Sequence, residues 1–116
     1  MRKIFVFGSN LAGRHGKGAA LSAIREHGAI YGIGIGPQGN AYAIPTKDYY
    51  INTLPTDIIK EYVEAFIEYA FSHPELKFEV TPIGCGLAGY QPWEIGPMFK
   101  GSPENVFLPA VFKEYV

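Results

Sequence analysis

Two glycine-rich segments hold the residues whose types and spacing best suit the binding of an anion. The first is GSNLAGRHGKG, residues 8–18, and the second is GCGLAGY, residues 84–90. Glycine leaves backbone N–H groups uncovered and tolerates positive φ, and both properties help to cradle a phosphate group. Arg14 and Lys17 add positive charge within the first segment. A second interpretation stays open, in which the glycines only make sharp turns against the sheet.

The predicted ligand-binding residues are the glycines of both segments and their neighbours. They are Gly8, Ser9, Asn10, Gly13, Arg14, Gly16, Lys17, Gly18, Gly84, Cys85, Gly86, Leu87, Ala88, Gly89 and Tyr90. As candidate catalytic residues, Asn10 could position a water, and His15 or Lys17 could act as general acid or electrophile. Equally, Asn10 could cap a turn, and His15 and Lys17 could face water or a phosphate group. The Thr-Lys-Asp sequence at 46–48 follows another strand end and forms a lesser set.

Cys85 is the single cysteine, so no internal disulfide can form and a reducing cytoplasm is the expected location. Its thiol could act as a nucleophile beside an anion site, but a small buried residue at a tight strand end is the favoured interpretation. Tyr90 and Trp93 could stack on a base, although the core is the more usual place for them. The histidines are scattered, and we expect neither a metal site nor a cofactor.

Two familiar nucleotide motifs are excluded. The first segment is not a Walker-type phosphate loop, because Leu11 stands where that motif has its first glycine and Gly18 where it has Ser or Thr. Residues 34–39 match G-x-G-x-x-G by letter, but the strand-like AYAIPT at 41–46 follows them in place of a helix. That match is therefore interpreted as accidental.

Length and composition predict one folded domain over residues 1–116. Apolar residues make up 47% of the chain and aromatic residues 15%, which excludes a disordered protein and predicts a dense core. Ten Lys and Arg face eleven Asp and Glu without a basic cluster, so a nucleic-acid partner is not expected. The opening MRKIFVF carries too few apolar residues for a signal-peptide core or a membrane span, so no membrane partner is expected either.

Helices between successive strands predict an α/β fold with a largely parallel sheet. The first half of the chain is predicted to form a strand at 4–7 ended by 8–10, a helix at 17–27 stopped by Gly28, short strands and loops at 29–40, and a strand at 41–46 closed by Pro45. A long helix capped by Thr56 or Asp57 follows, and its apolar stripe consists of Ile59, Val63, Phe66, Ile67 and Ala70. The last predicted elements are a strand at 78–83, a short helix at 92–99 and a strand at 105–109. Both glycine-rich segments then follow the carboxyl ends of strands, where ligands bind in such sheets.

The combination of FVFGSNLAGRHGKGAALSAI, YAIPTK, a long helix, VTPIGCGLAGYQPWEI and NVFLP resembles the macro domain, the ADP-ribose-binding module, over nearly the whole chain. The resemblance implies a three-layer α/β/α sandwich with a mixed, largely parallel sheet. It also implies that ADP-ribose or a related ribose-phosphate nucleotide binds between the two glycine-rich segments. Asn10 would lie near the distal ribose, and residues 13–18 would contact the diphosphate.

The chain departs from the family at functional positions. Its first aspartate is Asp48, whereas the family selects adenine through an acidic residue near the start. Ala88 and Gly89 follow Leu87 where one hydrolytic subclass has an aspartate. Two alternatives to simple binding stay open: a hydrolase acting on an ADP-ribosylated substrate or an ADP-ribose phosphate derivative, and a structural or interaction protein of bacterial or phage type without a small ligand. The sequence does not predict the oligomeric state.

Overall fold

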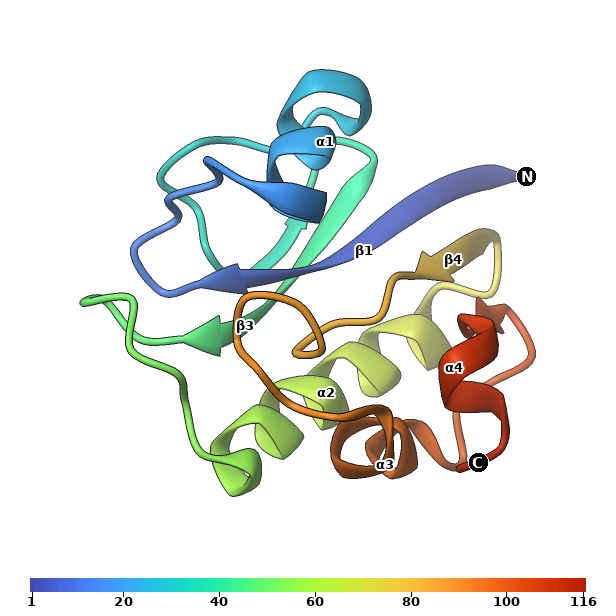
Figure 1. Ribbon diagram of the computed structural model, residues 1–116. Coiled ribbons are helices and arrows are strands. Elements are labelled where there is room, and N and C mark those ends of the chain that lie inside the picture. The colour runs from blue at the N-terminus through green and yellow to red at the C-terminus, as the bar shows by residue number, and fades with distance from the viewer.

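One five-stranded sheet runs through the molecule in the computed structural model, which describes residues 1–116 (Figure 1). The elements in chain order are β1 Arg2–Asn10, α1 Gly18–His27, β2 Gly36–Gln38, β3 Ala41–Lys47, α2 Thr56–Ser72, β4 Leu76–Val80, α3 Pro92–Ile95, the 3-10 turn η1 Gly96–Phe99, β5 Val106–Phe107 and α4 Ala110–Lys113. The predicted α/β class is confirmed.

The order of strands in the sheet is β2-β3-β1-β4-β5. The ladders β3–β1, β1–β4 and β4–β5 are parallel, and only β2 runs antiparallel to its neighbour β3. The sheet is therefore mixed and largely parallel, as the sequence predicts. The chain passes from the central β1 to β3 on one side and then to β4 on the other, which creates a topological switch point between β1 and β4. Loops that leave these two strands diverge there and make room for a crevice.

Alternate residues of the strands belong to two separate cores, because successive side chains of a strand point to opposite faces. Ile4 and Val6 of β1 belong to the larger core, which includes four buried residues of α2: Ile59, Val63, Phe66 and Ala70. The smaller core lies on the α1 side and consists of Phe7, Ala20, Ala23, Ala29, Ala41 and Ala43. Figure 1 shows α1 on one side of β1 and β3, with α2, α3 and α4 on the other. The alanines let α1 approach the sheet closely beside the end of β1.

The two long helices form for the reasons that their sequences suggest. The stripe of α2 recurs at helical spacing and is buried as predicted, with Ile67 partly buried beside it. The helix ends of α1 and α2 differ in how they are capped. Gly28 ends α1 with a φ of 77°, the left-handed conformation that glycine adopts at low cost. The prediction of a Thr56 or Asp57 cap is wrong, because Pro55 occupies the N-cap position of α2 and no side chain caps it.

No helix of the chain combines the length and the apolar character needed to cross a bilayer.

Strand β1 is longer than predicted and includes the residues 8–10 that were expected to end it. Their pairing with β3 continues to Lys47, so the ladder extends the strand beyond its apolar run. Pro45 does not close β3 but lies within it, opposite Ser9. Because β2 pairs only with residues 41–43, one side of β3 has no partner strand at Pro45, and the missing N–H is tolerated there.

The later elements also differ from prediction at their ends. Strand β4 begins and ends earlier than the expected 78–83, and residues 81–83 belong to the turn that follows it. Strand β5 is shorter than the expected 105–109 and is followed by α4, which was not predicted. The predicted helix at 92–99 is divided between α3 and η1. Each of these elements is only two to five residues long, which leaves little periodic signal in the sequence.

Candidate functional site

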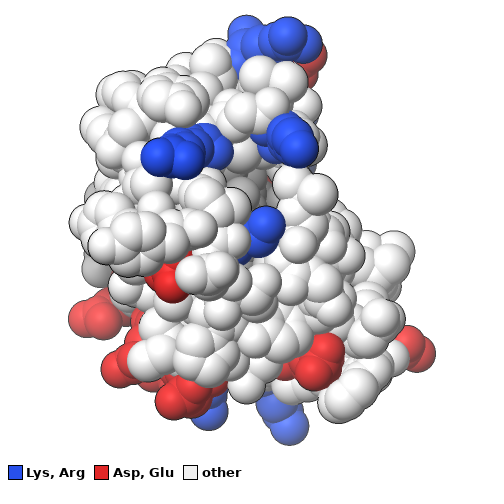
Figure 2. Space-filling view, turned by 60° about the vertical axis from the view of Figure 1, so that its left-hand side comes forward, with Lys and Arg blue, Asp and Glu red and all other residues white.

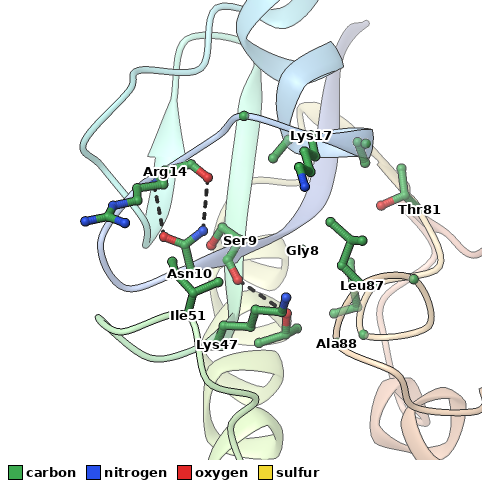
Figure 3. A pocket seen from close by; sticks show the side chains of 18 of the residues that line it. Gly8, Ser9, Asn10, Arg14, Lys17, Lys47, Ile51, Thr81, Leu87 and Ala88 are labelled. Atoms are coloured by element: carbon green, nitrogen blue, oxygen red, sulfur yellow. Dashed lines mark hydrogen bonds between the residues drawn. The ribbon is translucent and has the colours of Figure 1, made fainter.

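A cavity of about 490 Å³ lies at the switch point, beside the carboxyl ends of β1, β3 and β4 (Figure 2 and Figure 3). It is lined by Gly8, Ser9, Asn10, Arg14, Gly16, Lys17, Gly18, Ala19, Ala20, Thr46, Lys47, Ile51, Thr81, Pro82, Ile83, Gly84, Gly86, Leu87 and Ala88. Both glycine-rich segments therefore face one cavity. Of the predicted binding residues, four do not line it: Gly13, Cys85, Gly89 and Tyr90.

Gly8 and Gly84 bring the ends of β1 and the turn after β4 into close contact. A Cβ at Gly8 would lie 3.6 Å from the backbone nitrogen of Gly84 and 3.6 Å from Cβ of Ile83. Gly84 has a φ of +75°, and a Cβ there would lie 3.1 Å from the side chain of Ile95. A Cβ at Gly8 would make ordinary contact with the turn, whereas a side chain at Gly84 would strain the turn and press on Ile95.

The turn at 84–90 presents a row of free backbone donors. Its own closure uses the N–H of Gly89, which donates to the Gly86 carbonyl at 3.0 Å, and the N–H of Tyr90, which donates to the Gly84 carbonyl at 2.8 Å. The N–H groups of Gly84, Gly86, Leu87 and Ala88 have no acceptor within the chain, and all four residues line the cavity. Unpaired amides on successive residues of a cavity lining are suited to an anion.

The loop that follows β3 holds this turn in place. The Thr53 hydroxyl donates to the Ala88 carbonyl at 3.1 Å, and the Tyr90 hydroxyl donates to the Leu54 carbonyl at 2.6 Å. Tyr90 thus anchors the turn and also packs against the larger core. Trp93, which was expected in the core, is instead exposed and does not line the cavity.

Cys85 is free and half-buried, and its side chain packs against the larger core. Burial, and secondarily the charge of Glu94, raise the pKa of the Cys85 thiol above its ordinary value. A nucleophilic cysteine needs the opposite shift, because the thiolate is the reactive form. The structural interpretation of Cys85 is therefore favoured.

The amino end of α1 supplies a second group of free donors. The N–H groups of Gly18, Ala19 and Ala20 have no acceptor within the chain, and these residues line the cavity. Lys17 occupies the N-cap position without a side-chain cap, and the first turn holds no acidic residue. The uncompensated positive end of the helix dipole therefore faces the cavity together with the lysine ammonium.

Asn10 closes the first glycine-rich segment. Its Nδ2 donates to the Arg14 carbonyl at 3.0 Å, and its Oδ1 accepts from the Arg14 N–H at 2.9 Å (Figure 3). The side chain is buried, and both polar atoms are used within the loop. Gly13 is also buried, with a φ of +69°, and a Cβ there would collide with the backbone of Gly32 and Ile33. Both residues shape the loop, Asn10 as part of the cavity lining and Gly13 from outside it.

His15, a predicted catalytic residue, is not brought into the cavity. Only 1% of it is exposed, its Nε2 lies 2.8 Å from the Ile33 carbonyl oxygen, and its ring meets Phe7 edge-on. Its Nδ1 has no hydrogen-bond partner.

No group of His, Cys, Asp or Glu side chains in the chain could hold a metal ion. Lys17 and Asn10 are the candidate catalytic residues that do line the cavity.

The charged residues that line the cavity are all cations, namely Arg14, Lys17 and Lys47. None of the three is within ion-pair distance of a carboxylate. Figure 2 shows Lys and Arg side chains around the hollow and most Asp and Glu side chains lower on the same face. In Figure 3 the side chains of Lys17 and Lys47 extend toward the cavity, while that of Arg14 points away. Lys47 was only a lesser candidate by sequence, but its partner in the β1–β3 ladder is Asn10.

Two apolar side chains, Ile51 and Leu87, reach the cavity from opposite sides (Figure 3). Ile51 lies in a turn organised by Asp48, whose Oδ1 accepts the N–H groups of Tyr50 and Asn52. Its φ is 65°, which is unfavourable for a β-branched residue. Leu87 is 68% exposed at the tip of its turn. Sequence reasoning missed Ile51, because nothing in its local pattern indicates the fold of that turn.

The match of residues 34–39 to G-x-G-x-x-G is accidental, as predicted. Residues 36–38 form β2 and lead by a turn into β3, so no helix follows the glycines. Gly34 is instead a packing residue, because a Cβ there would collide with the carbonyl of Asn10.

When the chain is compared with known proteins, no protein-family model, no curated protein and no solved structure matches it.

Proposed function

We propose that this chain is a macro-domain-like module that binds ADP-ribose or a related ribose-phosphate nucleotide in the cavity. The observation that carries the proposal is that two groups of residues with unpaired backbone donors line one cavity together with Lys17 and Lys47, and that no carboxylate lines it. Backbone donors and a helix amino end are well suited to phosphate oxygens, and the volume lies within the range of small-molecule sites.

The arrangement of the elements is compatible with the expected architecture. Helix α1 on one face of a mixed sheet and α2 on the other support the three-layer α/β/α sandwich that the resemblance implies. The proposed ligand position, beyond the carboxyl ends of β1 and β4, also agrees with the general rule for such sheets. A reducing cytoplasmic location accords with the unpaired Cys85.

The geometry favours binding over hydrolysis. Both polar atoms of the Asn10 side chain are engaged by the Arg14 backbone, and His15 is buried away from the cavity. A general base must lie within hydrogen-bond reach of the proton that it removes, and no carboxylate or histidine lines the site. We therefore assign no catalytic step to these residues.

Calorimetric titration with ADP-ribose tests the proposal directly. A bound ligand must also stabilise the fold, so the melting temperature should rise with ligand concentration. If neither heat nor a thermal shift is seen at millimolar ADP-ribose or a related nucleotide, the proposal is wrong.

Gly86→Val separates a ligand site from a structural turn. A Cβ at Gly86 would meet nothing within 4 Å, and its φ is not positive, so the variant should fold. Gly86 lines the cavity with an unpaired N–H, so the added branches should obstruct that donor and weaken binding by about tenfold. Ala65→Val, on the exposed side of α2, is the matched control and should bind normally. If Gly86→Val alters only stability, the glycines of this turn have no part in binding.

A further inference from the structure

The uncharged polar side chains that line the cavity already hydrogen-bond within the chain. The hydroxyls of Ser9, Thr46 and Thr81 each donate their hydrogen to a backbone carbonyl. Asn10 uses both its amide nitrogen and its amide oxygen on the backbone of its own loop. Ser9, Asn10 and Thr46 are each less than a tenth exposed. The hydroxyl hydrogens are therefore committed to the protein, and only hydroxyl oxygen lone pairs stay available as side-chain acceptors.

The groups that stay free are donors and cations. They comprise the unpaired N–H groups of the α1 first turn, those of the turn at 84–88, and the ammonium groups of Lys17 and Lys47. All of them suit the oxygen atoms of phosphate groups and sugar hydroxyls. An exocyclic amine on a base requires an acceptor, and no carboxylate lines the cavity to provide one. The hydroxyl oxygens of Ser9 and Thr46 are nearly buried, which makes them poor acceptors for a base.

The remaining contact surface is apolar. Ile51 and Leu87 can pack against the flat face of any base, since such contact depends on shape and area and not on the hydrogen-bonding edge. Apolar contacts discriminate only weakly between related ligands. A site built to hydrogen-bond a particular group, in contrast, discriminates against analogues that lack this group by factors of about 10⁴ or more. The lining thus has the chemistry for weak discrimination.

We infer that the site recognises the diphosphate and the sugar but does not read the base. Its ligand class is then nucleoside diphosphate sugars irrespective of base, with ADP-ribose as one member. The inference rests on the proposed function and adds to it, because it predicts that the diphosphate and the sugar, and not the base, supply specific affinity.

Three ligands that differ only in the base test it by calorimetry: ADP-ribose, IDP-ribose and UDP-ribose. IDP-ribose replaces the adenine amine with a carbonyl and otherwise keeps the purine. Dissociation constants within about tenfold of one another support the inference. If ADP-ribose binds and both others bind more than about a hundredfold more weakly, the inference is overturned while the proposed function stands. If none of the three binds, the proposed function fails, and the inference fails with it.

Variants locate the contacts that matter. Lys47→Gln should weaken all three ligands by a similar factor, about tenfold, because its ammonium acts on the phosphate groups that they share. Lys60→Gln, on the exposed side of α2, is the matched control and should change none of them. Leu87→Ala should weaken the binding of all three ligands by the same small factor. An effect of either cavity variant confined to ADP-ribose would show that the base is read, contrary to the inference.

Discussion

Lys47 pairs with Asn10 in the β1–β3 ladder, immediately after a register shift that follows the pair of Ser9 and Pro45. The end of β1 thereby supplies Asn10, which closes the first glycine-rich loop, and the end of β3 supplies Lys47, a cation that lines the cavity. Ladder irregularities at strand ends commonly redirect side chains beside a site. The loop closure and the placement of the charge therefore share one geometric origin.

Asn10→Ala should destabilise the protein. The change leaves the partly buried N–H and carbonyl of Arg14 without their partners, which should lower the free energy of unfolding by about 1–3 kcal/mol. Urea unfolding followed by circular dichroism measures the loss. Asn10→Asp keeps the acceptor for the Arg14 N–H, so its free energy of unfolding should fall less than that of Asn10→Ala. If Asn10→Ala unfolds like the wild type yet abolishes turnover of an ADP-ribosylated substrate, the residue is catalytic and its assignment to loop closure is wrong.

Ile51→Asn should stabilise the fold and weaken ligand binding. Asparagine tolerates a φ of 65° better than a β-branched residue, so relief of strain should add about 1 kcal/mol to the free energy of unfolding. Loss of the apolar contact should raise the dissociation constant for ADP-ribose several-fold. Thermal melts and calorimetry give the two quantities. Ile51→Val stays β-branched and should show no gain in stability, and an equal gain in both variants would contradict strain as the cause.

His15→Leu should leave binding unchanged and stability within about 1 kcal/mol of the wild type. The Ile33 carbonyl would keep a partner, because it also accepts from Nε2 of Gln38 at 3.0 Å. The change also removes the buried Nδ1 that has no partner, which offsets the lost packing. Melting temperature and ADP-ribose affinity are the measurements. A tenfold loss of affinity without a change in melting temperature would place His15 in the binding machinery after all.

Tyr42 should make the fold sensitive to strong alkali. Burial in the larger core, and secondarily its neighbour Tyr69, raise the pKa of Tyr42 to about 12 from an ordinary 10.0. The unfolded chain therefore loses this proton at lower pH than the folded protein does. The resulting stabilisation, of the order of 2 kcal/mol, is complete below pH 10 and is lost as the pH rises toward 12.

The measurement for Tyr42 is the free energy of unfolding between about pH 9.5 and pH 11.5. Tyr42→Phe should show a shallower decline than the wild type over this range, because it lacks the titrating hydroxyl. Tyr49→Phe changes an exposed tyrosine and should keep the wild-type slope. Identical slopes in the wild type and Tyr42→Phe would contradict the assignment.

The features that the sequence predicts well are those with local causes. The stripe of α2 and the stop at Gly28 follow from helical spacing and from the freedom of glycine to adopt positive φ. The two glycine-rich segments could be assigned to strand ends because apolar runs precede both of them. Their convergence on one cavity follows from the rule for parallel sheets and not from either segment alone.

The features that the sequence does not predict depend on which segments meet in space. Gly13 matches a phosphate-binding pattern, yet it serves close packing because the backbone at 32–33 crosses it. His15 is buried for the same reason, under a loop that has no local signal for its path. The importance of Lys47 appears only once β3 is known to lie beside β1. Composition and periodicity do not encode such pairings.

The thinness of the layer between α1 and the sheet has a consequence for how affinity could be adjusted. Ala20 and Ala23 are the buried contacts of this helix, so a single added methyl group at either would wedge the helix outward. Its amino end, with the amides that we assign to phosphate, would move with it. If the cavity binds a nucleotide as proposed, a change at Ala23, which does not line the cavity, should weaken that binding from the interior of the molecule.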